Sequence, residues 1–192
     1  PEVLTIASVS GVLPEEEAVL KGKCSHLLIL DKAHTNLLLK YDCPEYLSCD
    51  RAAGLVAARH LFKGKACSIF DFGTTLSIDR TDSEGRYVSG SISPGCRTRF
   101  KSIFRYSKSL PLLDTPEKIP SEGTSLNSSI EFGILSGIMF EIEGYVSSHP
   151  ENIIVFTGGD ANYFAKRMKN SIFVVCNLVL IGLALIADGY AD

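Results

Sequence analysis

The 192-residue sequence has no tryptophan, only two methionines and no cluster of basic residues. Its 19 Lys and Arg are outnumbered by 22 Asp and Glu, which gives a formal net charge of −3. Proteins that bind nucleic acid usually carry a basic patch, so we expect no nucleic-acid partner. Hydrophobic residues make up 45% of the chain, which is ordinary for a globular protein with a real core.

The spacing that a structural zinc site needs is also missing. No two cysteines form a CxxC pair, and the four histidines lie at no familiar ligand spacing, so we expect no structural zinc. No signal peptide is recognisable in the sequence, and we therefore interpret the cysteines as buried, reduced thiols of a cytoplasmic protein. The cysteines are Cys24, Cys43, Cys49, Cys67, Cys96 and Cys176.

One apolar stretch, from Ile172 to Ala187, is too short to cross a membrane. A membrane-spanning helix needs about 20 consecutive apolar residues, and this stretch is interrupted by Cys176, Asn177 and Gly182. The pattern predicts a buried strand over 172–175, a turn at 176–177 and then a buried helix. We expect no membrane segment.

Apolar periodicity and turn residues predict a meander of strands followed by alternating helices and strands, which favours a mixed sheet with helices on its faces. In the helix over 128–146, the isoleucines Ile130, Ile134, Ile138 and Ile142 repeat every four residues and mark one face. Gly133 and Gly137 repeat at the same spacing and predict close packing of another element. Lys63-Gly64-Lys65 closes the helix predicted over 51–62 and is the candidate boundary between domains 1–65 and 66–192. The predicted strands cover 3–7, 27–30, 67–70, 75–79, 86–92 and 152–156, and the predicted helices begin at Pro14 or cover 51–62, 97–108, 128–146 and 161–169.

The segment from Asp71 to Thr75 reads Asp-Phe-Gly-Thr-Thr and joins two apolar runs, as a tight loop between strands does. Glycine lets a phosphate approach the main chain, and amide and hydroxyl groups can hold phosphate oxygens. The carboxylate of Asp71 can hold a cation. The alternative is a polar β-turn whose Asp only caps the chain.

Two further segments have both a structural and a functional interpretation. Asp50 and Arg51 stand at the start of a predicted helix. They are either a helix cap and a residue of a surface ion pair, or a general base beside a cation that holds a substrate carboxylate. Gly158 and Gly159 lie between a buried strand and a helix. They indicate either a ligand lying on the backbone at a helix N-terminus or an ordinary strand-to-helix turn.

The order and spacing of these motifs resemble those of the type III pantothenate kinases, over nearly the whole chain. That family belongs to the actin-like and sugar-kinase superfamily, so the resemblance implies an α/β fold of two ribonuclease H-like domains with mixed sheets, the first incomplete in this chain. The motifs that carry the resemblance are Asp50-Arg51, Asp71-Phe72-Gly73-Thr74, Gly85 with Ser89 to Gly95, Leu110-Pro111-Leu112, Thr157-Gly158-Gly159 and Asn177 to Leu183.

The resemblance implies ATP-dependent phosphorylation of pantothenate to 4′-phosphopantothenate, the first step of coenzyme A synthesis. It also implies Mg²⁺, a monovalent cation (K⁺ or NH₄⁺) and a homodimer. Asp50 matches the catalytic base, and Asp71 matches the ligand of the monovalent cation. The matching pantothenate-binding residues are Tyr41, Ser48, Cys49, Asp50 and Arg51, and the matching ATP-binding residues are Gly73, Thr74, Gly158 and Gly159.

Three departures from the family pattern leave alternatives open. The family's Asp-x-Gly-Asn-Thr phosphate loop has no match, so we predict that this chain lacks an N-terminal segment before Pro1. Ser48 stands where the family usually has glycine. Leu126 falls near a family threonine that contacts pantothenate, although a small shift places Thr124 there instead. A non-catalytic, nucleotide-binding relative with an accessory role in gene regulation, and another actin-like sugar or acetate kinase, are the competing hypotheses.

Overall fold

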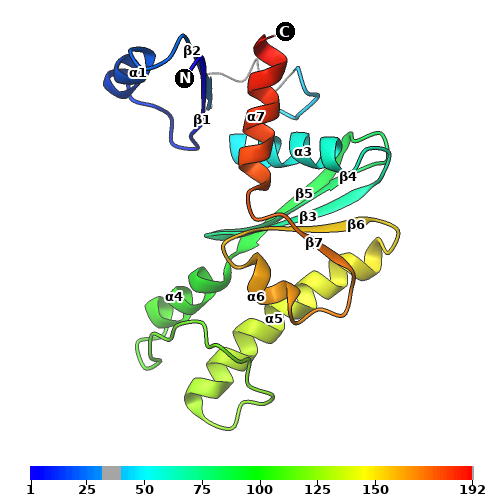
Figure 1. Ribbon diagram of the computed structural model, residues 1–192. Coiled ribbons are helices and arrows are strands. Elements are labelled where there is room, and N and C mark those ends of the chain that lie inside the picture. Colours follow the sequence, from blue (N-terminus) through cyan, green and yellow to red (C-terminus); the bar gives the residue numbers. More distant parts are fainter. Residues whose placement is uncertain (32–39, 192) are drawn as a thin grey trace. The chain divides into compact units, whose positions relative to one another are not determined.

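The structure is a computed structural model that describes residues 1–31 and 40–191 (Figure 1). The chain forms two compact units. The first unit comprises Pro1–Cys67, Asp79–Ser89 and Asn177–Asp192, and the second unit comprises Ser68–Ile78 and Gly90–Cys176. The division into domains 1–65 and 66–192 stays a prediction.

The first unit opens with a strand, helix and strand: β1 (Val3–Ala7), α1 (Pro14–Lys21) and β2 (His26–Leu30). The two strands pair in parallel, with Val3 opposite His26. The predicted helix start is confirmed, since α1 begins at Pro14 and carries three glutamates in its first turn. Proline suits the first helical position, and acidic side chains favour the positive end of the helix dipole.

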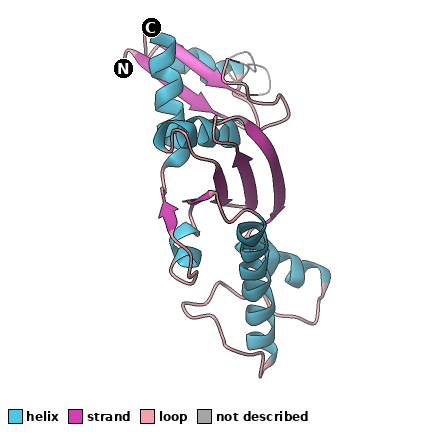
Figure 2. Ribbon diagram, turned by 90° about the vertical axis from the view of Figure 1, so that its right-hand side faces the viewer, coloured by secondary structure: helices cyan, strands magenta, loops and turns pink. Residues whose placement is uncertain are grey.

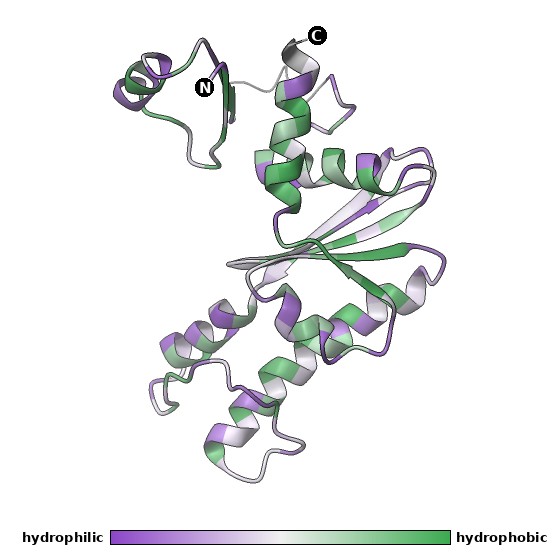
Figure 3. Cartoon of the chain, in the orientation of Figure 1, coloured by the Kyte–Doolittle hydropathy of each residue, from purple (hydrophilic) through white to green (hydrophobic). Residues whose placement is uncertain are grey.

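Helices α3 (Cys49–Leu61) and α7 (Leu178–Ala191) lie side by side in the first unit (Figure 1). Figure 3 shows α7 as hydrophobic along much of its length, as expected for a buried helix. A Cβ atom at Gly182 would lie 1.9 Å from the carbonyl oxygen of Ala53, so glycine permits this close approach. In the part of the chain that the structure describes, no helix is long and apolar enough to span a membrane.

A five-stranded mixed sheet runs in the order β5-β4-β3-β6-β7, with the strands labelled in Figure 1 and coloured magenta in Figure 2. β3 and β4 are neighbours joined only by Gly73 and Thr74, which requires them to be antiparallel. β6 and β7 are parallel, so the predicted mixed sheet is confirmed. The strands are β3 (Cys67–Phe72), β4 (Thr75–Thr81), β5 (Tyr87–Pro94), β6 (Ile153–Gly158) and β7 (Ile172–Val174).

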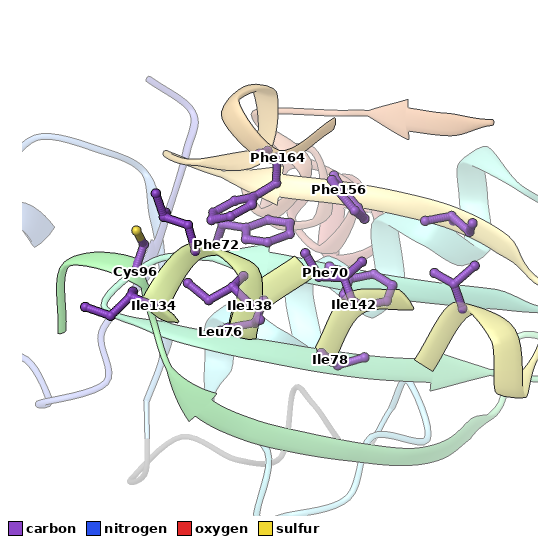
Figure 4. Packing of buried hydrophobic residues seen from close by; sticks show 14 of the residues in the cluster. Phe70, Phe72, Leu76, Ile78, Cys96, Ile134, Ile138, Ile142, Phe156 and Phe164 are labelled. Atoms are coloured by element: carbon purple, nitrogen blue, oxygen red, sulfur yellow. The ribbon is translucent and has the colours of Figure 1, made fainter. Parts of the chain in front are cut away.

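The core of the second unit forms between this sheet and α5 (Leu126–Ser148) (Figure 4). The isoleucines predicted at four-residue spacing all face this core, and complete burial of such a side chain contributes about 1.5–3 kcal/mol. They are Ile130, Ile134, Ile138 and Ile142. Phe72 anchors the end of β3, because the centroid of its ring lies 4.8 Å from the ring centroid of Phe156 and 5.1 Å from that of Phe164.

The second unit also contains α4 (Cys96–Tyr106) and the short α6 (Ala161–Ala165). The close packing predicted at the glycines of α5 is wrong for this chain. Among the described residues, a Cβ at Gly133 would meet nothing within 4 Å, and one at Gly137 would meet only the Nη1 atom of Arg99, at 4.0 Å.

Several elements end at other residues than predicted, and three of the changes move a candidate site residue. β3 continues through Asp71 and Phe72, β6 continues to Gly158, and α3 begins at Cys49 rather than Arg51. Main-chain hydrogen bonds extend each element beyond the apolar run from which it was predicted. Asp71 is therefore a strand residue, and Asp50 lies in the first turn of a helix.

Candidate active site

The loop formed by Gly73 and Thr74 is held by main-chain contacts of the second unit. The Gly73 amide donates to the Thr75 carbonyl oxygen at 3.0 Å. The Thr74 carbonyl oxygen accepts two further hydrogen bonds, from the Gly95 amide at 3.0 Å and from the Thr98 hydroxyl at 2.6 Å. The loop is therefore attached to the N-terminal turn of α4.

Gly95 has no room for a side chain. A Cβ atom there would lie 2.1 Å from the Gly73 carbonyl oxygen and 2.9 Å from that of Thr74. This explains the glycine that follows Pro94: the turn before α4 must touch the backbone of the Gly73–Thr74 loop.

Gly158 brings the two predicted glycine-containing loops together at the ends of the neighbouring strands β3 and β6. Its φ of +87° lies in the left-handed region, which favours glycine. A Cβ atom at this position would lie 2.5 Å from the Asp71 Oδ1 atom and 2.6 Å from the Phe72 carbonyl oxygen. The Asp160 amide also donates to the Phe72 carbonyl oxygen, at 3.4 Å.

A cavity of about 520 Å³ opens beside these loops in the second unit. Three of the four predicted ATP-binding residues line it, namely Gly73, Thr74 and Gly159. Gly158 is not among the lining residues and instead lies against Asp71. The remaining lining residues are Phe72, Arg97, Thr98, Lys101, Asp114, Thr115 and Asp160.

Two cationic residues of the cavity wall, Arg97 and Lys101, were missed by the sequence analysis. They lie four residues apart on α4, so they share one face of the helix. This spacing, directly after the Pro94-Gly95 turn, was the available signal. The wall also carries Asp160, whose pKa is raised by burial.

In the first unit, Asp50 lies in the first turn of α3, one residue beyond Cys49. The helix cap is Ser48, so the interpretation of Asp50 as the cap is wrong. The Asp50 Oδ1 atom accepts a hydrogen bond from the Arg51 amide at 2.9 Å. Cys49 is buried, and burial raises the pKa of its thiol.

Arg51 forms a two-point ion pair with Asp79 on β4. The Arg51 Nε atom donates to Asp79 Oδ2 at 2.9 Å, and Nη2 donates to Oδ1 at 2.5 Å. The two side chains are only 9% and 4% exposed, so the interpretation of Arg51 as part of a surface ion pair is wrong. Asp79 was also missed, and its signal was a charged residue inside an apolar strand pattern.

Tyr41 is held in the first unit by contacts with two helices. Its carbonyl oxygen accepts a hydrogen bond from the Arg59 Nη1 atom of α3. A Cβ atom at Gly189 of α7 would lie 2.9 Å from the Tyr41 hydroxyl, so the tyrosine lies close to that helix. Burial raises the pKa of the Tyr41 hydroxyl. The predicted pantothenate residues thus lie together in one unit.

Leu126 is the first residue of α5, and its side chain is 55% exposed. It lines a second cavity of about 520 Å³, together with Gly133 and other residues of α4 and α5. The Thr124 amide donates to the Ser128 hydroxyl at 3.0 Å. Both positions that the sequence analysis considered for the family threonine therefore lie at the N-terminal end of α5.

In the part of the chain that the structure describes, the side chains that could ligate a metal ion are not gathered in groups of three. Among residues 1–31 and 40–191, no group of three His, Cys, Asp or Glu side chains is arranged to hold a metal ion. Asp71 is not part of such a group, so a cation at its carboxylate would need its other ligands from main-chain or substrate oxygens. Such oxygen ligands suit hard cations.

Comparison with known proteins identifies one family. The model of the family described as type III pantothenate kinase matches residues 2–148. A type III pantothenate kinase of Cytophaga hutchinsonii is 40% identical over 157 residues, which cover 78% of this chain and 66% of the relative. One of Christiangramia forsetii is 36% identical over 188 residues, which cover 95% of this chain and 77% of the relative.

Solved structures agree with an actin-like fold. A Baf family protein of Campylobacter jejuni matches with a TM-score of 0.63 and 20% identity, covering 94% of this chain and 80% of that protein. MreB5 of Spiroplasma citri bound to AMPPNP matches with a TM-score of 0.50 and 16% identity, and the match covers 98% of this chain and 69% of that protein. The expected actin-like fold is thereby confirmed.

Proposed function

Since this chain belongs to the type III pantothenate kinase family, we propose that it phosphorylates pantothenate to 4′-phosphopantothenate with ATP, the first step of coenzyme A synthesis. The observation that carries the proposal is the cavity of the second unit. Gly73, Thr74 and Gly159 line it although they come from distant parts of the chain. Exposed main-chain groups and a hydroxyl in such a cavity suit a nucleotide phosphate.

The residues divide the proposed chemistry between them. Asp50 takes the proton from the pantothenate hydroxyl, and Tyr41, Ser48, Cys49 and Arg51 hold that substrate. Phosphoryl transfer depends mostly on positioning and charge neutralisation, and Mg²⁺ bound to the ATP phosphates supplies part of that neutralisation.

Asp71 is the proposed ligand of a monovalent cation, K⁺ or NH₄⁺. Its Oδ1 atom lies against Gly158, and the amide of Asp160 binds the adjacent Phe72 carbonyl oxygen. The main chain between Asp71 and the Gly73–Thr74 loop is thereby held in place, which supports the proposal of Asp71 as a cation ligand near the phosphate groups. In this proposal Gly158 does not contact the nucleotide itself but leaves room for the Asp71 carboxylate.

A cytoplasmic homodimer is part of the proposal. Gly133 and Leu126 line an open cavity of the second unit, and the exposed leucine stands near the position where the family has a pantothenate-contacting threonine. Leu126 in place of that threonine, together with Ser48 in place of the family's glycine, favours a second candidate. This candidate is a nucleotide-binding relative that does not turn over pantothenate.

The test is a coupled ADP-release assay on the complete natural protein that contains these 192 residues, with and without pantothenate and K⁺, in the presence of Mg²⁺. Turnover that depends on pantothenate and K⁺ supports the kinase. ATP binding without turnover supports the non-catalytic relative. Turnover with a sugar or acetate instead of pantothenate contradicts both.

A further inference from the structure

The Arg51–Asp79 ion pair is unusual because it is buried. Burying a charged pair costs desolvation free energy that its attraction often does not recover, and hydrophobic residues in its place are often at least as stable. Its two hydrogen bonds, at 2.9 and 2.5 Å, form a two-point contact that fixes the plane of the guanidinium group. A positioning role explains such a pair better than a role in stability.

The pKa shifts of the two side chains indicate that Arg51 is charged and favours an ionised Asp79. Burial raises the pKa of Asp79, and the adjacent Arg51 opposes that rise. The Asp79 carboxylate in turn raises the pKa of Arg51. The guanidinium is therefore charged at neutral pH, and its attraction favours the ionised form of Asp79.

The pair also controls the first turn of α3. Asp50 and Arg51 are consecutive helical residues, and the Asp50 Oδ1 atom accepts the Arg51 amide at 2.9 Å. Because neighbouring residues on a helix are separated by a fixed rotation, anchoring Arg51 on β4 sets the direction of Asp50. Asp79 uses two of the five N–H groups of the guanidinium, so Arg51 retains donors for a substrate carboxylate.

Two tyrosines extend the anchor at the start of β5. The Tyr46 hydroxyl donates to the Tyr87 hydroxyl at 3.0 Å, and the two rings meet edge to face with centroids 6.2 Å apart. Burial and this hydrogen bond raise the pKa of Tyr87 to about 12, so its hydroxyl stays protonated. Tyr87 also contributes to the raised pKa of Arg51.

A second arginine, Arg59, connects Tyr41 to the turn between β4 and β5. Arg59 lies two turns beyond Arg51 on α3, and its guanidinium donates to the carbonyl oxygens of Gly85 and Tyr41. Residues 79–87 therefore anchor both Tyr41 and the first turn of α3.

We propose that Asp79 is a positioning residue for the proposed pantothenate segment, acting through Arg51 to orient Asp50. This inference rests on the proposed function for its substrate, but its contacts lie within the first unit and do not depend on it. The Asp50-Arg51 motif does not indicate Asp79, which lies 28 residues beyond Arg51 in the chain.

The experiment compares Asp79→Asn with Asp82→Asn in the complete natural protein. Asp82 forms an exposed ion pair with Arg86 in the turn after β4, so it loses the same charge without breaking a buried pair. Asparagine keeps the acceptor that binds the amides of Glu84 and Arg86. Two quantities are measured: hydrogen exchange of the peptide spanning 46–55, and the separate KM values for pantothenate and ATP.

We expect Asp79→Asn to speed exchange in that peptide and to raise the KM for pantothenate by about ten- to hundredfold, as the loss of partners that orient metal ligands does. The KM for ATP should stay within about twofold, because Asp79 is not among the residues that line the proposed nucleotide cavity. Asp79→Glu, which keeps the carboxylate, should recover part of the loss, and Asp82→Asn should match the wild type.

Unchanged exchange and pantothenate KM in Asp79→Asn would overturn the inference, as would an equal rise in both KM values. If Asp79→Asn does not fold, Tyr87→Phe replaces it, because it removes only a hydroxyl group. A selective rise in the pantothenate KM then supports the inference, and wild-type kinetics contradict it. If the wild-type protein never turns over pantothenate, the proposed function fails, while the exchange comparison still decides the role of Asp79.

Discussion

The two units hold their candidate site residues in different ways. In the first unit, charged side chains hold the segments together through hydrogen bonds: Arg51 binds Asp79, and Arg59 binds the carbonyl oxygens of Tyr41 and Gly85. In the second unit, glycines allow main-chain segments to touch: Gly95 lies against the Gly73–Thr74 loop, and Gly158 lies against Asp71 and Phe72.

This difference has a consequence for substitutions. A contact between side chains can be weakened by degrees, because a neutral side chain of the same shape loses only the charge, and a homologous side chain keeps the charge but changes the length. A close backbone approach has no intermediate state, since the smallest possible side chain already adds a Cβ atom. We therefore expect graded effects in the first unit and all-or-none effects at the glycines of the second.

The largest effect is expected from Asp50→Asn. Loss of a general base lowers kcat by about 10²- to 10⁴-fold. ATP binding should be unchanged, because the residues that line the nucleotide cavity belong to the second unit. Steady-state kinetics and nucleotide titration check the two halves of this prediction. Asp42→Asn is the control, since Asp42 is exposed and asparagine tolerates its φ of +51°. A wild-type rate in Asp50→Asn would disprove the base assignment.

Gly158→Ala should abolish ATP binding and destabilise the protein. A left-handed conformation costs alanine about 1–2 kcal/mol, and overpacking adds about 1–3 kcal/mol. Denaturant unfolding and nucleotide titration measure the two effects. Gly144→Ala is the matched control: nothing lies within 4 Å of its Cβ position, and alanine favours the helix by about 0.5–1 kcal/mol. Equal stability of the two variants would show that the close approach at Gly158 is not required.

Replacing Arg97 and Lys101 together by glutamine should raise the KM for ATP several-fold and leave that for pantothenate unchanged. Both residues line the nucleotide cavity, and cationic side chains attract phosphate groups in a salt-dependent manner. The KM for ATP, measured at low and high ionic strength, should differ from the wild type mainly at low salt. Arg105→Gln, on the same helix but outside the cavity, is the control. A KM for ATP equal to that of the wild type at low salt would exclude both residues from nucleotide binding.

The smallest expected effect is a gain in stability from Asp160→Asn. Burial raises the pKa of Asp160 above its ordinary value of 3.8, so the ionised carboxylate disfavours the folded state. That cost is present near pH 7 and disappears as the pH falls below 3.8, where the folded and unfolded states are both protonated. The thermal midpoint of the variant should exceed that of the wild type at pH 7, and the difference should shrink with acidification. A difference that is constant with pH would contradict the assignment.

Much of the fold was predictable because the elements have clear local signals. Pro14 and the glutamates after it mark a helix start, the isoleucines of α5 mark a buried face, and Gly73 with Thr74 marks a tight hairpin. The ends of elements were less predictable, as Asp71 and Asp50 show. Hydrogen bonding to a neighbouring strand or turn continues an element after its apolar pattern stops.

The order of the motifs by itself determined the family, the glycine loops and the candidate base, because these depend on residue types at short spacing. Only the tertiary structure decided that Arg51 pairs with Asp79, that Arg97 and Lys101 line the nucleotide cavity, and that Gly158 lies against Asp71. Each of these contacts joins residues that are distant in the chain or on different elements. Their approach depends on strand order and helix packing, which local residue patterns do not encode.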